Sequence, residues 1–426
     1  MSPKPFHVYK DSGVPWCPMI PESWSVSTVK RIAKFTTGWT PPSGNSDFYG
    51  EEYFWANISD IGPKVLNETS KGISQLAIDT FNLESSKPGD LLFSFKLSIG
   101  QVSLVGREMY TNEAIATFKK VDGYDIRWAF YAFPNFIPEN SEKNIYGAPL
   151  LNQERIKNAK IFFPPLSEQQ NIASFLDREI LKIDELIKKQ EMLINLLIEK
   201  RQSQISNLIF CNHVEKTSSK LKFLIKTRKG IAFKAADFTD EGVSVVKASD
   251  IKRLTLLSGK SFLPNKFLDL YPQAILKTDE ILISTVGSNP TVTNSAVGQI
   301  AKVPMQSNGS LLNQNNVVFS PDDKVLTNDY LFYFIQTKAY RDHLDLHAHG
   351  TANQSSLSID DILNFDIEIP PINIQKTIVK TITVSTEKID NLMAKSYESI
   401  ALIKEHRFSI ISAAVTGKID VRELAQ

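Results

Sequence analysis

The 426-residue sequence lacks most patterns that mark secreted, membrane and metal-binding proteins. Its two cysteines, Cys17 and Cys211, are too few for a disulfide framework or a cysteine metal site, so we expect both thiols to be structural. No apolar run approaches the roughly 18–20 residues of a membrane span, and the polar, proline-bearing N-terminus is unlike a signal peptide. A formal net charge of +1 gives no bulk attraction to nucleic acid. We therefore expect a cytoplasmic protein.

Familiar catalytic motifs are missing as well. The sequence has no Gly-rich phosphate loop, no Walker lysine, no G-x-S-x-G and no H-E-x-x-H. His343, His347 and His349 have spacings that approach a metal site, but no cysteine or fixed carboxylate pattern accompanies them, which favours a polar helix end. "SPDDKV" from Ser320 has the letters of a nuclease cluster, yet its composition is typical of a turn. We assign no catalytic residue and no metal ligand.

An internal repeat is the strongest feature that is present. "FFPPLSEQQNIASFLDREILKIDELIKKQ" from Phe162 returns as "EIPPINIQKTIVKTITVSTEKIDNLMAKS" from Glu368, with Pro164 over Pro370 at an offset of 206 residues. Without a gap, 16 of 46 aligned positions are identical, which indicates a duplication. Pro-Pro forces extended backbone before each copy, and a long stretch without proline or glycine follows. This predicts a long helix from Gln169 to Ile209 and an equivalent helix near the C-terminus.

Both predicted helices carry an apolar seam with heptad spacing, which ends at Arg201 in one copy and Arg407 in the other. The seam residues are Leu176, Ile180, Ile183, Ile187, Gln190, Ile194 and Leu197, then Ile382, Thr386, Ile389, Met393, Ser396, Ile400 and Ile403. A single stripe usually packs on a core, whereas two equivalent stripes favour pairing with each other. Homologous halves predict an antiparallel coiled coil on a pseudo-twofold axis, about 60 Å long.

The segments before the helices repeat more loosely. "YFWANISDIG" from Tyr53 matches "VSVVKASDIK" from Val243, and "DLLFSF" matches "EILIST", both at an offset of 190 residues. "TNEAIATF" from Thr111 matches "LNQNNVVF" at an offset of 201, so insertions separate short strands that persist. The predicted fold class is α+β, with two β-rich mixed domains joined by the two long helices. We predict domains at 1–160 and 213–368, and helical segments at 161–212 and 369–426.

These motifs together resemble the specificity subunits of type I restriction-modification systems, over nearly the whole chain. "TTGWTPPSGNSDFYGEEYFWANISDI" and "KGIAFKAADFTDEGVSVVKASDI" look like the openings of that family's two target recognition domains. "PPLSEQQNIASFLD" is similar to its central conserved region, and "IPPINIQKTIV" with "AAVTGKID" to its distal one. The distal copy departs from the central one by having Ile374 where the central one has Glu168.

The resemblance implies a non-catalytic protein that binds double-stranded DNA. Each recognition domain would read one half of a bipartite, asymmetric target, and the paired helices would set the gap between the halves. Two adenine methyltransferase subunits would dock on the helices, and motor-nuclease subunits would join for cleavage. S-adenosylmethionine, ATP and magnesium would belong to those partners, with no cofactor in this chain and no membrane.

Base contacts are expected from polar loop residues at strand ends. The candidates are Trp39, Thr40, Asn45, Lys96 and Ser98 in the first domain, and Arg228, Lys229, Lys234, Ser288 and Asn289 in the second. The last set begins in a strip from Lys216 to Lys234 that holds seven basic residues and no acid. For each candidate the alternative is a solvated loop residue, or for Trp39 a packing anchor. For the whole chain the alternative is a protein-binding scaffold on a coiled-coil strut.

Overall fold

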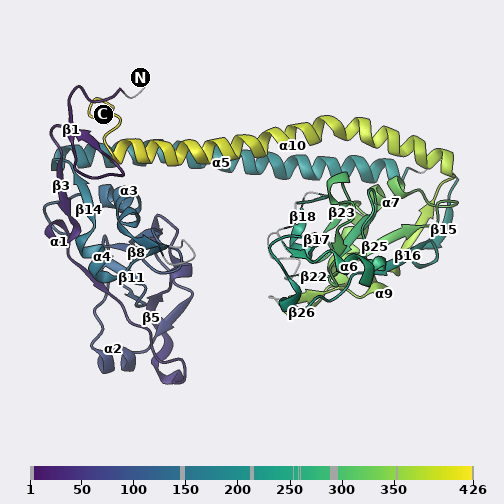
Figure 1. The fold of residues 1–426 in the computed structure, drawn as a ribbon, viewed down its shortest axis with the longest axis horizontal. Coiled ribbons are helices and arrows are strands. Elements are labelled where there is room, and N and C mark those ends of the chain that lie inside the picture. The colour runs from purple at the N-terminus through teal and green to yellow at the C-terminus, as the bar shows by residue number, and fades with distance from the viewer. Residues whose placement is uncertain are drawn as a thin grey trace. The chain divides into compact units, whose positions relative to one another are not determined.

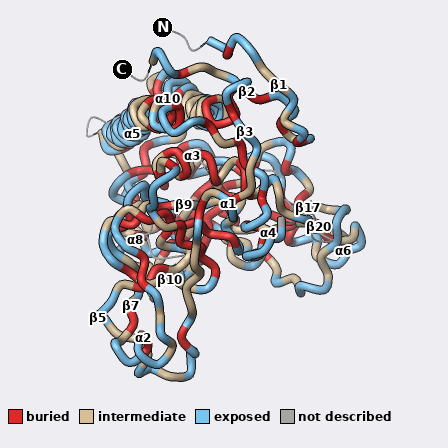
Figure 2. Tube along the Cα trace, turned by 90° about the vertical axis from the view of Figure 1, so that its left-hand side faces the viewer, coloured by how far each residue is buried: buried red, intermediate tan, exposed pale blue. Residues whose placement is uncertain are grey.

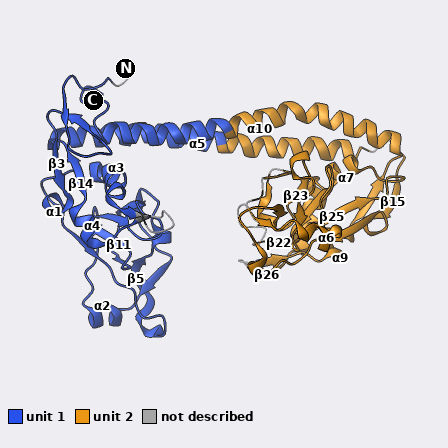
Figure 3. Ribbon diagram, viewed as in Figure 1, with its two compact units in different colours: residues 1–190, 398–426 blue, residues 191–397 orange. Residues whose placement is uncertain are grey.

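The computed structural model describes residues 4–143, 149–211, 215–252, 254–257, 259, 261–287, 296–351 and 354–424. The chain divides into two compact units, which Figure 3 colours separately. Unit 1 comprises Met1–Gln190 and Glu398–Gln426, and unit 2 comprises Glu191–Tyr397. Each unit therefore contains one globular segment and part of both long helices.

The two long helices lie where the repeat predicts them. Helix α5 spans Leu166–Ile209 and helix α10 spans Ile372–Val415, 44 residues each (Figure 1). Both begin and both end at positions that differ by the repeat offset of 206. Pro165 and Pro371 stand immediately before the first helical residues, where a missing N–H costs no helical hydrogen bond.

The predicted seam faces inward in both units. In unit 1, Leu176 and Ile180 of α5 belong to one core cluster with Ala414 and Val415 of α10. In unit 2, Ile205 and Ile209 of α5 share a cluster with Ile382 of α10. The start of one helix thus lies beside the end of the other, and the pairing is antiparallel, as predicted. All fourteen residues of the predicted seam, Gln190 and Ser396 included, are buried or half-buried.

An ion pair joins the helices in each unit, and these two pairs are copies of each other. Asp184 accepts from Arg407 at 3.0 Å in unit 1, and Asp390 accepts from Arg201 at 2.6 Å in unit 2. The repeat maps Asp184 onto Asp390 and Arg201 onto Arg407, so each copy gives its aspartate to one unit and its arginine to the other. Half-exposed pairs of this kind stabilise weakly, by roughly 0.2–1 kcal/mol, and act mainly on register.

The globular part of unit 1 is built on a five-stranded mixed sheet in the order β4-β11-β8-β9-β6, where only β6 and β9 pair in parallel. Unit 1 also holds a three-stranded sheet, β10-β5-β7, and the two-stranded pairs β14-β3, β1-β2 (Tyr9–Asp11, Met19–Pro21) and β12-β13 (Glu142–Lys143, Pro149–Leu150). The strands are β3 (Ser25–Thr28), β4 (Phe35–Thr37), β5 (Tyr49–Ala56), β6 (Val65–Leu66), β7 (Lys71–Ile73), β8 (Leu91–Ser94), β9 (Val102–Val105), β10 (Tyr110–Thr111), β11 (Ile115–Phe118) and β14 (Lys160–Phe163). The helices are α1 (Val29–Ile32), α2 (Gln75–Phe81), α3 (Ile126–Phe136) and α4 (Gln153–Asn158).

Unit 2 repeats three of these sheets, except that its main sheet has four described strands, none of them a counterpart of β6. It also holds the sheets β18-β19 (Ile251–Lys252, Thr255–Leu256) and β22-β27-β26 (Val286–Gly287, Gln354–Ser356, His349–Thr351). The sheets β16-β25-β21-β23, β20-β17-β24 and β15-β28 correspond to β4-β11-β8-β9, β7-β5-β10 and β3-β14. The strands are β15 (Thr217–Lys220), β16 (Ile225–Lys229), β17 (Val243–Val246), β20 (Phe262–Leu263), β21 (Ile281–Ser284), β23 (Ile300–Lys302), β24 (Leu311–Leu312), β25 (Asn316–Pro321) and β28 (Asp366–Ile369). The helices are α6 (Lys266–Leu270), α7 (Asn328–Phe334), α8 (Lys338–His347) and α9 (Ile359–Leu363). The predicted α+β fold with duplicated domains is confirmed.

The repeated Ser-Asp-Ile motif has a local structural cause. Asp60 and Asp250 each turn back to accept the backbone N–H three residues earlier, from Asn57 at 2.9 Å and from Lys247 at 2.8 Å. These bonds satisfy a donor that the short 3-10 helix leaves free, as a capping aspartate does. Ile61 and Ile251 then enter the core. The motif therefore ends one strand and fixes the direction of the chain after it.

A buried glutamine attaches each globular part to its long helix. Gln169 accepts from the N–H of Asp125 at 2.9 Å and donates to the Pro164 carbonyl at 2.8 Å. Gln375 accepts from the N–H of Thr327 at 2.9 Å and donates to the Pro370 carbonyl at 2.9 Å. Asp125 and Thr327 are the N-caps of α3 and α7. Each amide therefore joins the entry of one long helix to the start of a core helix.

A tyrosine adds a second attachment in both units. Tyr131 on α3 donates to Asp177 of α5 at 2.7 Å, and Tyr333 on α7 lies 3.1 Å from the hydroxyl of Thr383 on α10. Asp177 and Thr383 are equivalent under the offset of 206. Burial raises the pKa of Tyr131 far above its ordinary value, so its hydroxyl keeps the proton that it donates.

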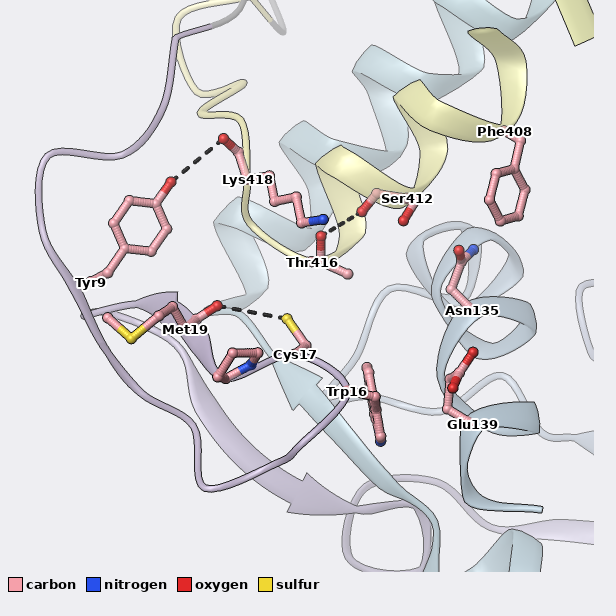
Figure 4. Close-up of a pocket in the computed structure, with 11 residues that line it drawn as sticks. Tyr9, Trp16, Cys17, Met19, Asn135, Glu139, Phe408, Ser412, Thr416 and Lys418 are labelled. Carbon is pink, nitrogen blue, oxygen red and sulfur yellow. Dashed lines mark hydrogen bonds between the residues drawn. The ribbon is translucent and has the colours of Figure 1, made fainter. Parts of the chain in front are cut away.

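The N-terminal segment of unit 1 packs against the end of α10. The Lys4 backbone carbonyl accepts from the N–H of Asp420, and the Tyr9 hydroxyl donates to the Gly417 carbonyl at 3.0 Å. Figure 4 shows Tyr9 beside Lys418, at the rim of a cavity of about 590 Å³ whose wall includes Trp16 and Phe408. Figure 2 shows buried residues gathered in the globular parts, whereas much of the surface of α5 and α10 is exposed.

The N-terminal segment explains why the first copy of the repeat has Glu168 where the second has Ile374. Glu168 is buried and accepts from the Trp24 indole at 2.7 Å and from the Ser23 hydroxyl at 3.0 Å. The residue before the equivalent strand of unit 2 is Lys216, which offers no indole. Ile374 therefore stands where a buried carboxylate would lack this partner.

We predict that Gln169→Leu lowers the free energy of unfolding by about 2–4 kcal/mol. The substitution leaves the Asp125 N–H and the Pro164 carbonyl buried without their partner, at about 1–3 kcal/mol each. Gln375→Leu has the same expected effect on unit 2. Gln170→Leu, at an exposed position next to Gln169, is the matched control and should change stability by less than about 0.5 kcal/mol. Equal thermal unfolding of Gln169→Leu and Gln170→Leu would contradict the role of the buried amide.

Candidate DNA interface

Three loops of unit 1 meet at one edge of its five-stranded sheet. They follow β4, follow β8 and precede β11, and these antiparallel strand ends lie side by side. We call residues 38–40, 95–101 and 112–114 the unit 1 recognition edge. Glu113 connects the loops, since its carboxylate accepts from the Thr40 hydroxyl and lies 3.9 Å from the Lys96 ammonium. The structure thus brings two predicted DNA-contact residues to one point.

The backbone at this edge is tightly packed. A Cβ on Gly38 would come within 2.4 Å of atoms of Thr111, so only glycine fits there. The next residue, Trp39, donates its N–H to the Thr111 carbonyl, and its carbonyl accepts from the Trp55 indole at 3.1 Å. The Trp39 ring stacks on Phe81 with centroids 3.7 Å apart. Trp39 thus packs within the unit at the wall of a cavity of about 420 Å³, and its contact with DNA stays a prediction.

Electrostatics hold Glu113 ionised. The hydrogen bond from Thr40 and the nearby Lys96 lower the pKa of Glu113 below its ordinary value. Half of the Glu113 side chain is exposed, and a carboxylate has acceptor sites to spare after two partners. The edge thus presents a fixed anion, a cation on Lys96 and the exposed Ser98. This mixture can accept from and donate to the edges of bases.

The equivalent edge of unit 2 comprises residues 230–234, 285–287, 296–298 and 313–315, and we call it the unit 2 recognition edge. Gly230 repeats Gly38, because a Cβ there would lie 2.1 Å from the Asn313 carbonyl. Ile231 donates its N–H to the Leu312 carbonyl, as Trp39 does to Thr111. Gln314 occupies the place of Glu113 and is exposed. The backbone frame is the same, while the side chains that it presents differ.

The loop after the central strand shows the largest difference between the two edges. In unit 1 the N–H of Gly100 closes the loop on the Ser94 carbonyl, and in unit 2 the N–H of Gly298 closes it on the Ser284 carbonyl. The serine hydroxyls donate to the second residue of each loop at the same 3.1 Å. The unit 2 loop is eight residues longer between these shared closures. Loops that vary on a constant scaffold are typical of binding surfaces.

The other predicted contact residues take different places. Lys229 and Lys234 are exposed near the unit 2 recognition edge. Asn45 is half-buried, and its side chain accepts from the Asp47 N–H at 3.0 Å. One guanidinium nitrogen of Arg228 donates to both carboxylate oxygens of Glu280, at 2.6 and 2.7 Å, and another donates to the Gln273 carbonyl. Ser288 and Asn289 lie outside the described residues.

The structure gives the histidines a local role. The side chain of His343 lies 2.8 Å from the Asp361 carbonyl, and that of His347 lies 2.8 Å from the His343 carbonyl. Within the described ranges no group of three or more His, Cys, Asp or Glu side chains is arranged to hold a metal ion. In the same ranges, every helix is too short or too polar to cross a bilayer.

Sequence reasoning did not select Glu113 or Gln314. The signal was present in the aligned "TNEAIATF" and "LNQNNVVF", where an exposed polar residue precedes a buried strand in both copies. Asn112 and Asn313 cap the turns there by accepting an N–H two residues later. The turn asparagines explain why the next side chain projects from the edge.

Comparison with known proteins gives a consistent result. The family described as "Type I restriction modification DNA specificity domain" matches residues 21–196 and again residues 213–401. The MjaVIII specificity subunit of a type I restriction enzyme from Methanocaldococcus jannaschii is 22% identical over 434 residues, covering 95% of each chain. The EcoBI specificity subunit from Escherichia coli is 20% identical over 332 residues, covering 72% of this chain and 68% of that one.

Among solved structures, a chain from work described as the assembly and conformational transition of the type I R-M system matches with a TM-score of 0.61. It is 15% identical and the match covers 94% of this chain and 99% of that chain, a likeness of fold. The two family matches together cover most of the sequence, one over each copy of the repeat. The chain therefore belongs to the family of type I restriction-modification DNA specificity proteins.

Proposed function

We propose that this DNA-recognition subunit of a type I restriction-modification system reads a bipartite, asymmetric target, with one recognition edge for each half-site. The observation that carries the proposal is the contrast between the edges. The backbones of the two edges form the same hydrogen bonds that close their loops. Glu113 in unit 1 is aligned with Gln314 in unit 2, and one loop is eight residues longer in unit 2. A carboxylate suits the amino group of cytosine and an amide suits adenine. Two unlike edges imply two unlike half-sites.

The long helices would act as the ruler between the half-sites. Each is a continuous helix of 44 residues, about 66 Å at 1.5 Å per residue. At roughly 3.4 Å per base pair, a rod of this length limits the gap to about 19 base pairs. Its ends are attached to the globular parts by Gln169 and Gln375, so that a change in helix length would be passed to the readers.

The helices also offer two equivalent docking positions. Leu186 and Leu392 are identical under the repeat and exposed, and so are Leu196 and Leu402. Leu186 and Leu402 lie in unit 1, and Leu196 and Leu392 lie in unit 2. Exposed leucines kept in both copies suit a protein partner. Two copies of one surface suit two adenine methyltransferase subunits, with the motor-nuclease subunits joining that complex.

We assign the chemistry to those partners. S-adenosylmethionine would serve the methyltransferase, and ATP and magnesium the motor-nuclease. This chain is the non-catalytic member and would act in the cytoplasm, where its DNA target is found.

The first test is to coexpress this chain with the methyltransferase encoded beside it, in a host without adenine methylation, and to map modified adenines across the genome. A gapped, asymmetric motif is expected. No modification by a complex shown to assemble and to bind S-adenosylmethionine would contradict the proposal and favour the protein-binding scaffold.

Inserting one heptad after Gln190 and one after Ser396 should lengthen the gap by about three base pairs and leave both half-sites unchanged. Seven residues add about 10 Å of helix while preserving the seam. Insertions of three residues at the same places break the seam and serve as the control. If the mapped half-sites change while the gap stays constant, the helices are not the ruler.

One substitution at the unit 1 recognition edge and one in the sheet of unit 2 should separate effects on DNA recognition from effects on stability. Lys96→Ala should lower methylation of the bipartite target by about 10- to 100-fold for a lost base contact, and relax the motif in the half-site read by unit 1 while the sequence of the other half-site stays the same. Arg228→Ala should instead lower the stability of unit 2 by about 1–3 kcal/mol, because Glu280 loses its partner, and should leave the motif unchanged. Mapped motifs and thermal unfolding of both variants measure the two effects. A changed methylation motif with Arg228→Ala would show that Arg228 contacts DNA bases.

A further inference from the structure

Leu97 combines two features that a leucine rarely shows together. It lies at the tip of the loop between β8 and β9, where its side chain is 92% exposed. Its backbone has a φ of 57°, in the left-handed region that disfavours residues with a Cβ. Among described residues, the other leucine at positive φ, Leu254, packs against the unit 2 core. Leu97 gains no such burial within the chain.

The loop holds Leu97 in this position. Strand β8 beneath it is fully buried, and the Ser94 carbonyl accepts from the N–H of Gly100 at 2.9 Å. The Ser94 hydroxyl donates to the Lys96 carbonyl at 3.1 Å, directly before Leu97. Glycine would adopt this φ without strain. A leucine that is strained, fixed and exposed indicates a use outside the folded chain.

The surroundings of Leu97 indicate what it contacts. Its neighbour Lys96 lies 3.9 Å from Glu113, and Ser98 is exposed on the other side. In the major groove of DNA, a carboxylate accepts from the amino group of cytosine, and an apolar side chain contacts the methyl group of thymine. The groove therefore offers partners both for the polar groups of this edge and for its apolar tip.

We propose that Leu97 is a specificity-determining residue that contacts the 5-methyl group of a thymine in the half-site read by unit 1. The proposal rests on the proposed function. Counting from the shared serine, Ser94 or Ser284, places Gly287 at the equivalent position in unit 2. Gly287 has no side chain to make this contact, so we expect the two half-sites to differ at this position.

The test uses the complex with the coexpressed methyltransferase and DNA carrying its mapped motif. Replacing each thymine of the unit 1 half-site in turn by uracil removes only the methyl group. One such replacement should weaken binding of the parent complex about three- to fivefold, as expected for one buried methyl group. Leu97→Gly should bind the thymine and uracil duplexes equally.

Asp279→Gly is the matched control for backbone strain. Asp279 has a φ of 68° and lies at the opposite end of the equivalent strand, and unit 1 has Gly89 at that place. Both glycine variants should unfold within about 3 °C of the parent, but Asp279→Gly should keep the preference for thymine. A lower unfolding temperature of Leu97→Gly alone would show a packing role instead.

Other outcomes overturn the inference and leave the proposed function standing. A motif that is methylated normally, with a thymine preference that survives Leu97→Gly, removes Leu97 from base reading. Strong fluorescence from 2-aminopurine placed in the half-site, on binding by the parent but not by Leu97→Gly, would show that Leu97 unstacks bases as a wedge. Absence of any gapped motif from an assembled complex would instead contradict the proposed function itself.

Discussion

The attachment of each globular part to its helix depends on one buried amide. Gln169 and Gln375 have no exposed surface, and each satisfies an N–H at the start of a core helix and a carbonyl in the Pro-Pro entry. Buried backbone groups cost free energy when they lose their partners, so this geometry admits little variation. Each copy of the repeat has this glutamine, preceded by the two prolines that hold the backbone extended before the helix begins. This joint, the tyrosine contact beside it and the apolar clusters shared with the helices connect the helices to the globular parts.

The scaffold and the edges obey different constraints. Strand pairing, the capping aspartates and the glycines at Gly38 and Gly230 set the backbone, and they agree between the units because sterics leave few alternatives. Side chains at the edge meet no such limit, since they project from turns that the backbone has already closed. Glu113 and Gln314 can therefore differ while the strands beneath them stay in register. A duplicated protein with these properties can change what it reads without changing how it folds.

The sequence predicts the helices well because their signals are local. Pro-Pro entry, a heptad seam and a second copy of both lead to α5 and α10, and their antiparallel pairing follows from the homology of the halves. The looser repeat before each helix predicts the strands.

Contacts across the sheet are harder to predict from the sequence. The sequence places Arg228 in a basic strip, whereas its pairing with Glu280 depends on segments that are 52 residues apart in sequence. Glu113 was overlooked because its partners, Thr40 and Lys96, come together only when three strand ends meet.

The crossed ion pairs have a consequence for how such a chain can change over time. Asp184 meets Arg407 and Asp390 meets Arg201, so each copy of the repeat completes its contacts with charges from the other. A substitution at one of these positions in one helix removes the partner of a charge on the other helix, which ties the two helical sequences to a common history. The ion pairs described within the globular segments, such as Arg228–Glu280, join residues of the same half of the sequence. Genetic crossover within the helices can therefore replace one reader by an unrelated one while every interhelical pair is kept, and new combinations of half-sites arise without passing through a misfolded intermediate.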